Sequence, residues 1–310
     1  MFVLASLMAL AAAGAALDLT GSHAGEDEDQ DDRPFGLGPA DPGEVGNVSS
    51  GAPEAGLPDP VTAPPAPDPA PGPATPAESP DQTIHGGADA DNLFGGTGRD
   101  TIHAGAGNDW VQGDGDYGPA GDDEIRGGAG DDLLAGQGGN DIIWGDEGDD
   151  TVMGGEGDDT LFGGSGNDWL SGHDGDDVLV SGGGADDLDG GRGDDLLVGD
   201  SDPDTVWMHG GEGDDTLMPG AGDFAEGQKG ADRFVLQQGP GPLPVIADFD
   251  AREDQLVLHL PDSIVRSARI DLAEDEDGTL LVTVNGEAIG RMLQAGGLAA
   301  ADIVVMGLPG

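Results

Sequence analysis

A nine-residue repeat constrains the fold of this chain more than any other feature of its sequence. From Gly86 the residues fall into units of the pattern Gly-Gly-x-Gly-x-Asp-x-apolar-x, with clean copies beginning at Gly154 and Gly163. Nine units run without a break across residues 127–207, and about 16 units are recognisable up to Val235. Asp at position six and an apolar residue at position eight recur throughout. Such a period indicates a repeat architecture in which each unit stacks on its neighbours.

The spacing also predicts the path of the backbone. Six residues of each unit form a Gly-rich turn and three form a short strand, so two units complete one coil of a right-handed parallel β-roll, or β-helix. Glycine at positions one, two and four is expected to supply positive φ angles. Position eight faces inward because side chains alternate along a strand. The predicted core is therefore one ladder of apolar residues: Val111, Ile125, Leu134, Ile143, Val152, Leu161, Leu170, Leu179, Leu188 and Leu197.

The position-six aspartates gather on the two edges of the predicted roll. Turns of units n and n+2 lie on the same edge, so their carboxylates stack at the inter-strand spacing, where bare charges repel and a bridging cation binds. Carboxylates and the carbonyls of a Gly-rich turn form a flexible all-oxygen shell, which suits Ca²⁺ better than the smaller, octahedral Mg²⁺. The candidate metal ligands are Asp91, Asp100, Asp109, Asp123, Asp132, Asp141, Asp150, Asp159, Asp168, Asp177, Asp186, Asp195, Asp204, Asp215 and Asp232.

Many units carry a second acid at position five, as in Asp131-Asp132 and Asp194-Asp195. Two interpretations are open for this residue: it stabilises the turn, or it joins the metal ligands. The pattern is interrupted twice. A stretched unit surrounds Tyr117-Gly118-Pro119, and the unit at 219–226 has Phe224 at its sixth position. Metal sites beside these two interruptions are expected to be weaker.

The composition agrees with cation binding. The chain has 63 Asp and Glu residues against 10 Lys and Arg, which gives a net charge of −53. Nucleic acid is excluded as a partner because its phosphate backbone would be repelled. Aromatic residues make up only 4% of the chain and Cys is absent, so neither a large aromatic core nor disulfides can hold the fold together. Bound Ca²⁺ is the expected stabilising element.

Residues 86–235 resemble the repeats-in-toxin (RTX) family, also called haemolysin-type calcium-binding repeats. The resemblance implies that each Ca²⁺ lies between the turns of units n and n+2, and that the chain leaves the cell by type I secretion. Residues after the repeats are similar to the C-terminal segment of serralysin-type secreted proteases. Within them, Asp302-Ile303-Val304-Val305 is similar to the acid and hydrophobic run that ends their secretion signal, and a plain last strand is the alternative.

Composition divides the chain into four regions. Residues 1–24 contain an uncharged Ala- and Leu-rich run that is a cleaved signal, a membrane anchor through residues 1–19, or neither. Residues 25–85 are acidic and Pro-rich, and we expect a disordered linker. Residues 86–235 form the β-roll, and residues 236–310 form a β-rich cap that covers its open end. In the cap, Asn285-Gly286 after an alternating apolar run predicts a hairpin.

One outward face of the predicted roll is apolar. Every second unit contributes to it, and its main residues are Trp144, Phe162, Val180 and Val198. We call these four residues the apolar stripe. A contiguous apolar patch on an acidic protein marks a contact surface. The stripe is expected to be covered by the C-terminal segment, or by a partner or a second copy of the chain.

No catalytic motif accompanies the repeats. The chain contains no His-Glu-x-x-His and no Gly-x-Ser-x-Gly. The sequence therefore predicts a non-enzymatic calcium-binding protein, secreted or anchored at the cell surface, whose folding is driven by Ca²⁺ bridging of the stacked Asp turns. The alternative is a non-catalytic carrier or secretion region that serves a separate toxin, protease or lipase subunit.

Overall fold

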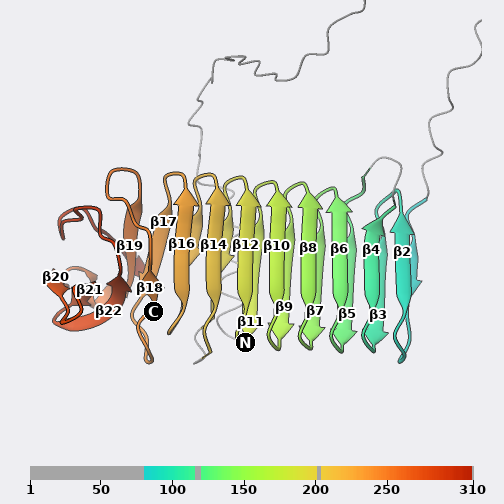
Figure 1. Cartoon of the computed structure of the whole chain (residues 1–310), viewed down its shortest axis with the longest axis horizontal. Coiled ribbons are helices and arrows are strands. Elements are labelled where there is room, and N and C mark those ends of the chain that lie inside the picture. Colours follow the sequence, from blue (N-terminus) through green and yellow to red (C-terminus); the bar gives the residue numbers. More distant parts are fainter. Residues whose placement is uncertain (1–79, 116–119, 201–203, 309–310) are drawn as a thin grey trace, which may run out of the picture. The chain divides into compact units, whose positions relative to one another are not determined.

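Two parallel β-sheets form the body of the protein. The structure is a computed structural model that describes residues 80–115, 120–200 and 204–308. Consecutive repeat units contribute strands to one sheet and then to the other, so hydrogen-bonded neighbours in each sheet come from units n and n+2 (Figure 1). This arrangement is a parallel β-roll. The predicted all-β fold class is confirmed.

The two sheets contain the following strands within the described residues. The first sheet has the order β1 (Thr83–His85), β3 (Thr101–Ala106), β5 (Glu124–Ala129), β7 (Ile142–Glu147), β9 (Thr160–Ser165), β11 (Val178–Gly183), β13 (Leu196–Val198), β15 (Thr216–Met218), β17 (Arg233–Gln237), β19 (Gln255–Pro261) and β23 (Val304–Leu308). The second has the order β2 (Asn92–Gly96), β4 (Trp110–Asp114), β6 (Leu133–Gly138), β8 (Thr151–Glu156), β10 (Trp169–Asp174), β12 (Asp187–Arg192), β14 (Trp207–Glu212), β16 (Phe224–Lys229), β18 (Val245–Ile246), β22 (Glu287–Met292), β21 (Leu280–Val284) and β20 (Ile270–Glu274).

Strands of the regular units are longer than the three residues that the repeat predicted. Strand β8, for example, has six residues. The prediction was too short because the first three positions of the next unit also pair with the coil beside them. Gly155 lies opposite Gln137, and Glu156 lies opposite Gly138. The turn between strands is correspondingly reduced to three residues, such as 157–159.

The position-eight residues form the core between the two sheets. All ten predicted core residues are completely buried, and stacked neighbours such as Ile143 and Leu161 lie directly opposite each other. The same row continues beyond the regular units through Met208, Leu217, Ala225 and Phe234. Each coil thus adds apolar side chains to one continuous column, which is stabilised mainly by their removal from water.

The C-terminal residues extend the roll and then close it. Strands β17, β19 and β23 continue the first sheet, while β18 and β22 continue the second, which ends in the antiparallel β22–β21–β20 meander. The short helix α2 (Asp262–Val265) follows β19. The predicted hairpin is confirmed, because Val284 pairs with Glu287 across Asn285 and Gly286, which have φ angles of 54° and 85°. Val304 and Val305 lie in the last strand, β23.

The C-terminal segment does not cover the apolar stripe, so that prediction was wrong. The stripe lies on β7, β9, β11 and β13, whereas the C-terminal strands join the far edges of the two sheets beyond β15 and β16 (Figure 1). The C-terminal strands therefore pair with the exposed backbone edge of the last coil. On the stripe itself, Trp144 and Phe162 stack with ring centroids 5.7 Å apart, and the Arg126 guanidinium lies 3.8 Å above the Trp144 ring.

The predictions for residues 1–24 and for most of the linker lie outside the described residues. Within residues 80–115, 120–200 and 204–308, no helix is both long enough and apolar enough to cross a membrane.

Candidate metal centre

The position-six aspartates form a hydrogen-bonded ladder along each edge of the roll. The backbone N–H of Asp141 donates to Oδ1 of Asp159 at 2.7 Å, and the N–H of Asp159 donates to Oδ1 of Asp177 at 2.8 Å. On the other edge, the N–H of Asp132 donates to Oδ1 of Asp150 at 2.8 Å. Each carboxylate therefore contacts the coil on its N-terminal side. We call these two rows the Asp ladder; the predicted stacking of carboxylates is present.

The second carboxylate oxygen of most ladder residues has no partner in the protein. Buried Oδ2 atoms without a hydrogen bond belong, among the described residues, to Asp100, Asp109, Asp123, Asp132, Asp141, Asp150, Asp159, Asp168, Asp177, Asp186, Asp195 and Asp215. Leaving one buried polar group unsatisfied costs about 1–3 kcal/mol, and a charged group costs more. A repeated row of such oxygens is the donor set that a bound cation requires.

Glycine at position one makes room for this oxygen. A Cβ atom on Gly154 would collide with Oδ2 of Asp159, although Gly154 itself does not have a positive φ. Positive φ angles occur instead at positions two and four, as in Gly155 at 132° and Gly157 at 120°. The prediction of positive φ at position one was therefore wrong, because its glycine answers a steric demand of the Asp side chain.

Backbone carbonyls lie beside the unpartnered oxygens. A Cβ on Gly127 would meet Oδ2 of Asp132 and, at 2.8 Å, the carbonyl oxygen of Gly145 from the next coil on that edge. Within the described part of the chain, no three Asp, Glu or His side chains converge as a ready metal cluster. A cation at this position would therefore combine ladder carboxylates with main-chain oxygens. Such a mixed, all-oxygen shell fits Ca²⁺.

Burial raises the pKa of many, though not all, of the ladder carboxyls. The pKa of Asp141 and of Asp195 rises to about 8, and that of Asp159 and of Asp168 rises to about 7. Loss of solvation is the main cause; the neighbouring carboxylates raise the pKa further, and the bound backbone N–H opposes the shift. An ionised ladder is thus unfavourable near neutral pH unless a cation compensates its charge.

The model of the RTX calcium-binding nonapeptide repeat matches residues 85–118, 117–152, 153–188, 171–206 and 189–223. Residues 85–223 belong to the RTX calcium-binding repeat family. A search of curated proteins found no match to the chain. The RTX match spans the regular part of the Asp ladder and ends before the C-terminal cap.

Position-five acids of the RTX units form a second, exposed ladder. The N–H of Asp149 donates to Oδ1 of Asp131 at 3.1 Å, and the N–H of Asp214 donates to Oδ1 of Asp194 at 2.8 Å. These bonds run in the opposite direction to those of the Asp ladder, since each carboxylate here contacts the coil on its C-terminal side. These bonds agree with the interpretation that position five stabilises the turn.

Strand pairing shifts the register of the unit that contains Asp204. Trp207 pairs with Asp187 and with Phe224, which places Trp207 at position seven. The sixth position of this unit therefore falls on Val206, and Asp204 is exposed. Extra residues lengthen this turn, so the pairing of strands, not the count from the preceding unit, sets the register. Asp204 stays a predicted ligand.

Asp223 takes a ladder position that the sequence reading missed. Because Phe224 is at position seven, Asp223 is at position six, and the expected break at Phe224 does not occur. Oδ1 of Asp223 accepts the N–H of Val206 at 3.0 Å, and Oδ2 accepts the N–H of Gly220 at 2.6 Å. Counting backward from Gly227 would have found this residue.

The two ends of the ladder differ from its centre. At the first unit, Oδ2 of Asp91 accepts the N–H of Gly87 at 2.7 Å, so this oxygen is satisfied by its own turn. At the last unit, the N–H of Asp232 donates to Oδ1 of Asp254 at 3.0 Å, and Oδ2 of Asp254 accepts the N–H of Asp250 at 2.7 Å. The ladder therefore ends in the cap, at an aspartate outside the repeat pattern.

Proposed function

We propose that the protein is an extracytoplasmic, non-enzymatic calcium-binding protein whose roll folds when Ca²⁺ bridges its stacked Asp turns. The row of twelve buried Oδ2 atoms without partners carries this proposal. It is supported by the RTX match, whose repeats are calcium-binding. Of the fifteen predicted ligands, the twelve aspartates with unpartnered oxygens have the most support, and Asp91, Asp204 and Asp232 stay predictions.

Calcium binding and folding are coupled in this proposal because each site draws on two coils. An unfolded chain has no preformed site, so the free energy of binding contributes directly to folding. Extracellular calcium modules bind single ions at about 10⁻⁴–10⁻³ M. When each ion ties one coil to the next, loading and folding become cooperative. The chain would be unfolded in the low-calcium cytosol and folded outside the cell, secreted or held at the surface through residues 1–19.

Circular dichroism of the purified full chain tests the coupling. In chelator at neutral pH we expect a largely disordered spectrum, and titration to millimolar Ca²⁺ should restore the β signal in a steep transition. Millimolar Mg²⁺ serves as the control and should be much less effective, since it accommodates a flexible carbonyl-rich shell poorly. A chelated protein with its full β signal would contradict the proposal.

A second copy of the chain is the proposed partner of the apolar stripe. Between β7 and β15, the outward residues at repeat positions seven and nine are Ile142, Trp144, Thr160, Phe162, Val178, Val180, Leu196, Val198, Thr216 and Met218, and none of them is charged. Asp146, two residues after Trp144 on β7, is an acid beside this row. Two chains of net charge −53 repel each other through most of their surface. This face therefore brings fewer like charges together than the rest of the surface.

Sedimentation velocity in saturating Ca²⁺ tests this contact. We expect a dimer that the Trp144→Asp variant converts to a monomer. Trp110→Asp, at an exposed position of the other sheet, is the control and should leave the dimer intact. A wild-type chain that remains monomeric would contradict the proposed contact between two copies. It would favour the carrier alternative, in which the stripe contacts a separate subunit.

A further inference from the structure

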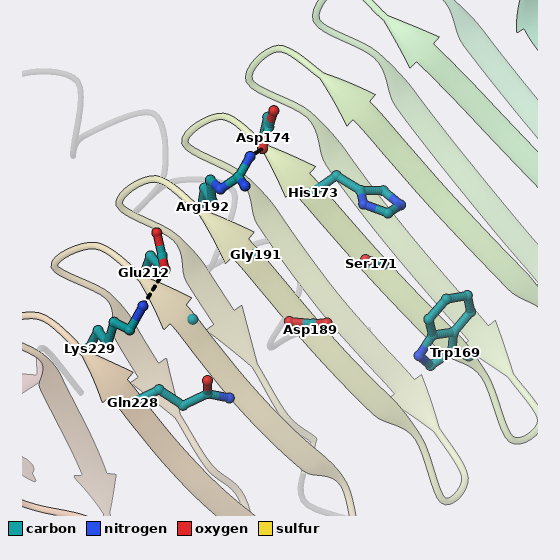
Figure 2. Close-up of a pocket in the computed structure, with 11 residues that line it drawn as sticks. Trp169, Ser171, His173, Asp174, Asp189, Gly191, Arg192, Glu212, Gln228 and Lys229 are labelled. Carbon is teal, nitrogen blue, oxygen red and sulfur yellow. Dashed lines mark hydrogen bonds and ion pairs between the residues drawn. The ribbon is translucent and has the colours of Figure 1, made fainter. Parts of the chain in front are cut away.

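An open groove of about 500 Å³ lies on the outer face of the second sheet, apart from the Asp ladder at the turns (Figure 2). It crosses β10, β12, β14 and β16. Its volume falls within the range of about 300–1,000 Å³ that small-ligand sites occupy. The lining combines one indole ring with polar side chains: Trp169, Ser171, His173, Asp174, Asp189, Gly191, Arg192, Gly211, Glu212, Gln228 and Lys229.

Two glycines create the groove by interrupting a row of outward side chains. Along this row His173 lies opposite Gly191, Gly191 opposite Gly211, and Gly211 opposite Gln228. The glycines leave a floor of bare backbone, while His173 and Gln228 stand at its two ends (Figure 2). The hollow therefore spans two strands and is bounded along the roll axis by an imidazole and an amide.

His173 and Gln228, at the two ends of the groove, both have a backbone conformation that favours glycine. The φ angle is 80° at His173 and 71° at Gln228, at the repeat position that is usually Gly. Within the roll, Gln137 and Asp146 are the other described non-glycine residues with positive φ. A side chain at such a position costs free energy that glycine would avoid, and strain of this kind concentrates at functional sites. Two of these four strained residues, His173 and Gln228, lie at the ends of the same groove.

The groove offers an exposed aromatic face beside hydrogen-bonding groups. The side chain of Trp169 is 41% exposed. Asp189 and the buried Ser171, only 3% exposed, occupy the neighbouring outward row, one on each of two adjacent strands. Together with His173 and Gln228 they supply both donors and acceptors. Trp207, 48% exposed, lies two strands from Trp169, which corresponds to roughly 9.5 Å.

Two ion pairs lie on the rim of the groove, and Asp189 is a further acid in its lining. Arg192 donates to Asp174 at 2.8 Å, and Lys229 pairs with Glu212 (Figure 2). Each cation already faces an acid, so neither is available to attract an anion. The surrounding protein is strongly negative, which repels anionic ligands. Anionic ligands are therefore disfavoured, and the exposed Trp169 ring beside hydroxyl-binding side chains suits a neutral, hydroxyl-rich ligand that has one flat apolar face.

We propose that this groove binds a neutral oligosaccharide. A pyranose ring presents C–H groups on its face and hydroxyls around its edge. One ring of the oligosaccharide would stack on Trp169, neighbouring rings would place their hydroxyls beside Asp189, His173 and Gln228, and a further ring would reach Trp207. Recognition by these residues needs the folded roll but no ladder carboxylate, so it is separable from calcium binding.

Titration of the full chain in millimolar Ca²⁺ with cellohexaose, chitohexaose and xylohexaose tests the proposal. Tryptophan fluorescence and isothermal calorimetry report binding, and circular dichroism in the same buffer reports folding. We expect saturable binding of at least one of these hexasaccharides. Trp169→Ala should weaken it by about tenfold or more, whereas Trp110→Ala, equally exposed at 41% on the same sheet, should leave it unchanged.

Variants of His173 and Gln228 provide a second test, in which misfolding is not expected to mimic a loss of binding. His173→Gly and Gln228→Gly restore the residue that the backbone favours, so the fold is expected to be retained or strengthened. The double variant should nevertheless weaken hexasaccharide binding severalfold. The proposal is overturned if no neutral hexasaccharide binds to the folded protein, if Trp110→Ala and Trp169→Ala have equal effects, or if an oligogalacturonate binds more tightly than the neutral sugars.

Discussion

Asp159 accepts the backbone N–H of Asp141 through Oδ1 at 2.7 Å, while its buried Oδ2 has no partner in the protein. One carboxylate oxygen thus ties two coils together, and the other is left to a cation. Because this relationship recurs along both edges, substitutions in a single unit can separate the two roles.

The Asp159→Asn variant is predicted to have opposite effects with and without Ca²⁺. The amide keeps an oxygen for the Asp141 N–H but removes the charge. In Ca²⁺ the variant should need a severalfold higher concentration to fold, because a charged ligand is lost. In chelator it should raise the folded fraction, since no uncompensated charge is buried.

Calcium titrations followed by circular dichroism measure both effects. Asp158→Asn is the matched control: Asp158 is exposed and accepts the N–H of Asp176 at 3.0 Å. Its substitution should change the calcium midpoint little. Equal shifts for the two variants would argue against a distinct ligand role for position six.

The chelated protein is predicted to gain structure as the pH falls. The folded-state pKa of Asp141 is about 8 and that of Asp159 about 7, whereas an unfolded Asp titrates near pH 4, at about 3.9. A raised pKa contributes stability that is complete below about pH 4 and lost as the pH rises through about 7–8. The β signal in chelator should therefore increase when the pH is lowered from about 8 to about 5.

The calcium-loaded protein should respond in the opposite way, because protons compete with Ca²⁺ for the same carboxylates. Its thermal unfolding temperature should fall as the pH is lowered over that range. If the chelated chain instead loses β signal on acidification, burial of the ladder carboxyls is not what opposes folding.

Gly154→Ala is predicted to destabilise the calcium-loaded protein by about 1–3 kcal/mol, as overpacking does elsewhere. The added Cβ would collide with Oδ2 of Asp159, although the φ of Gly154 is acceptable for alanine. Gly239→Ala is the control, since a Cβ there meets no atom within 4 Å and the φ is not positive. Denaturant unfolding should show a change of less than about 0.5 kcal/mol for the control.

Asp223→Ala should cost about 1.5–3 kcal/mol, because this completely buried carboxylate accepts backbone N–H groups from Val206 and Gly220. Asp204→Ala should cost less than about 0.5 kcal/mol, because Asp204 is exposed. Unfolding in saturating Ca²⁺ measures the difference. If Asp204→Ala instead costs more stability than Asp223→Ala, the register obtained by counting forward from the preceding units would be supported.

The regular units could be predicted almost completely from their spacing. Leu161 is buried and Asp159 joins the ladder because a nine-residue unit fixes which residues face inward and which lie at the turn. At the irregular unit of Asp223 this logic failed, because pairing with the adjacent coils restores a register that counting along the chain loses. The steric role of Gly154 was also hidden, since it depends on the direction of the Asp159 side chain.

The groove could have been found from the sequence only by comparing every second unit. His173, Gly191, Gly211 and Gln228 share no local motif, and they become neighbours because their strands stack in one sheet. In a roll, lateral contacts along a sheet face join residues about two units apart. A ligand site on such a face is therefore distributed over several repeats, each of which is ordinary by itself.

The alternation of units between two sheets also limits how such a chain can change in length. The ladder partners Asp141 and Asp159 are eighteen residues apart, which is one full coil. Inserting or deleting eighteen residues would preserve the face of every later residue. A change of nine would exchange the two faces, so that Trp169 and Gln228 would move to the side that carries the apolar stripe. Duplication of single units is thus disruptive, and this protein can lengthen or shorten its roll only by whole coils.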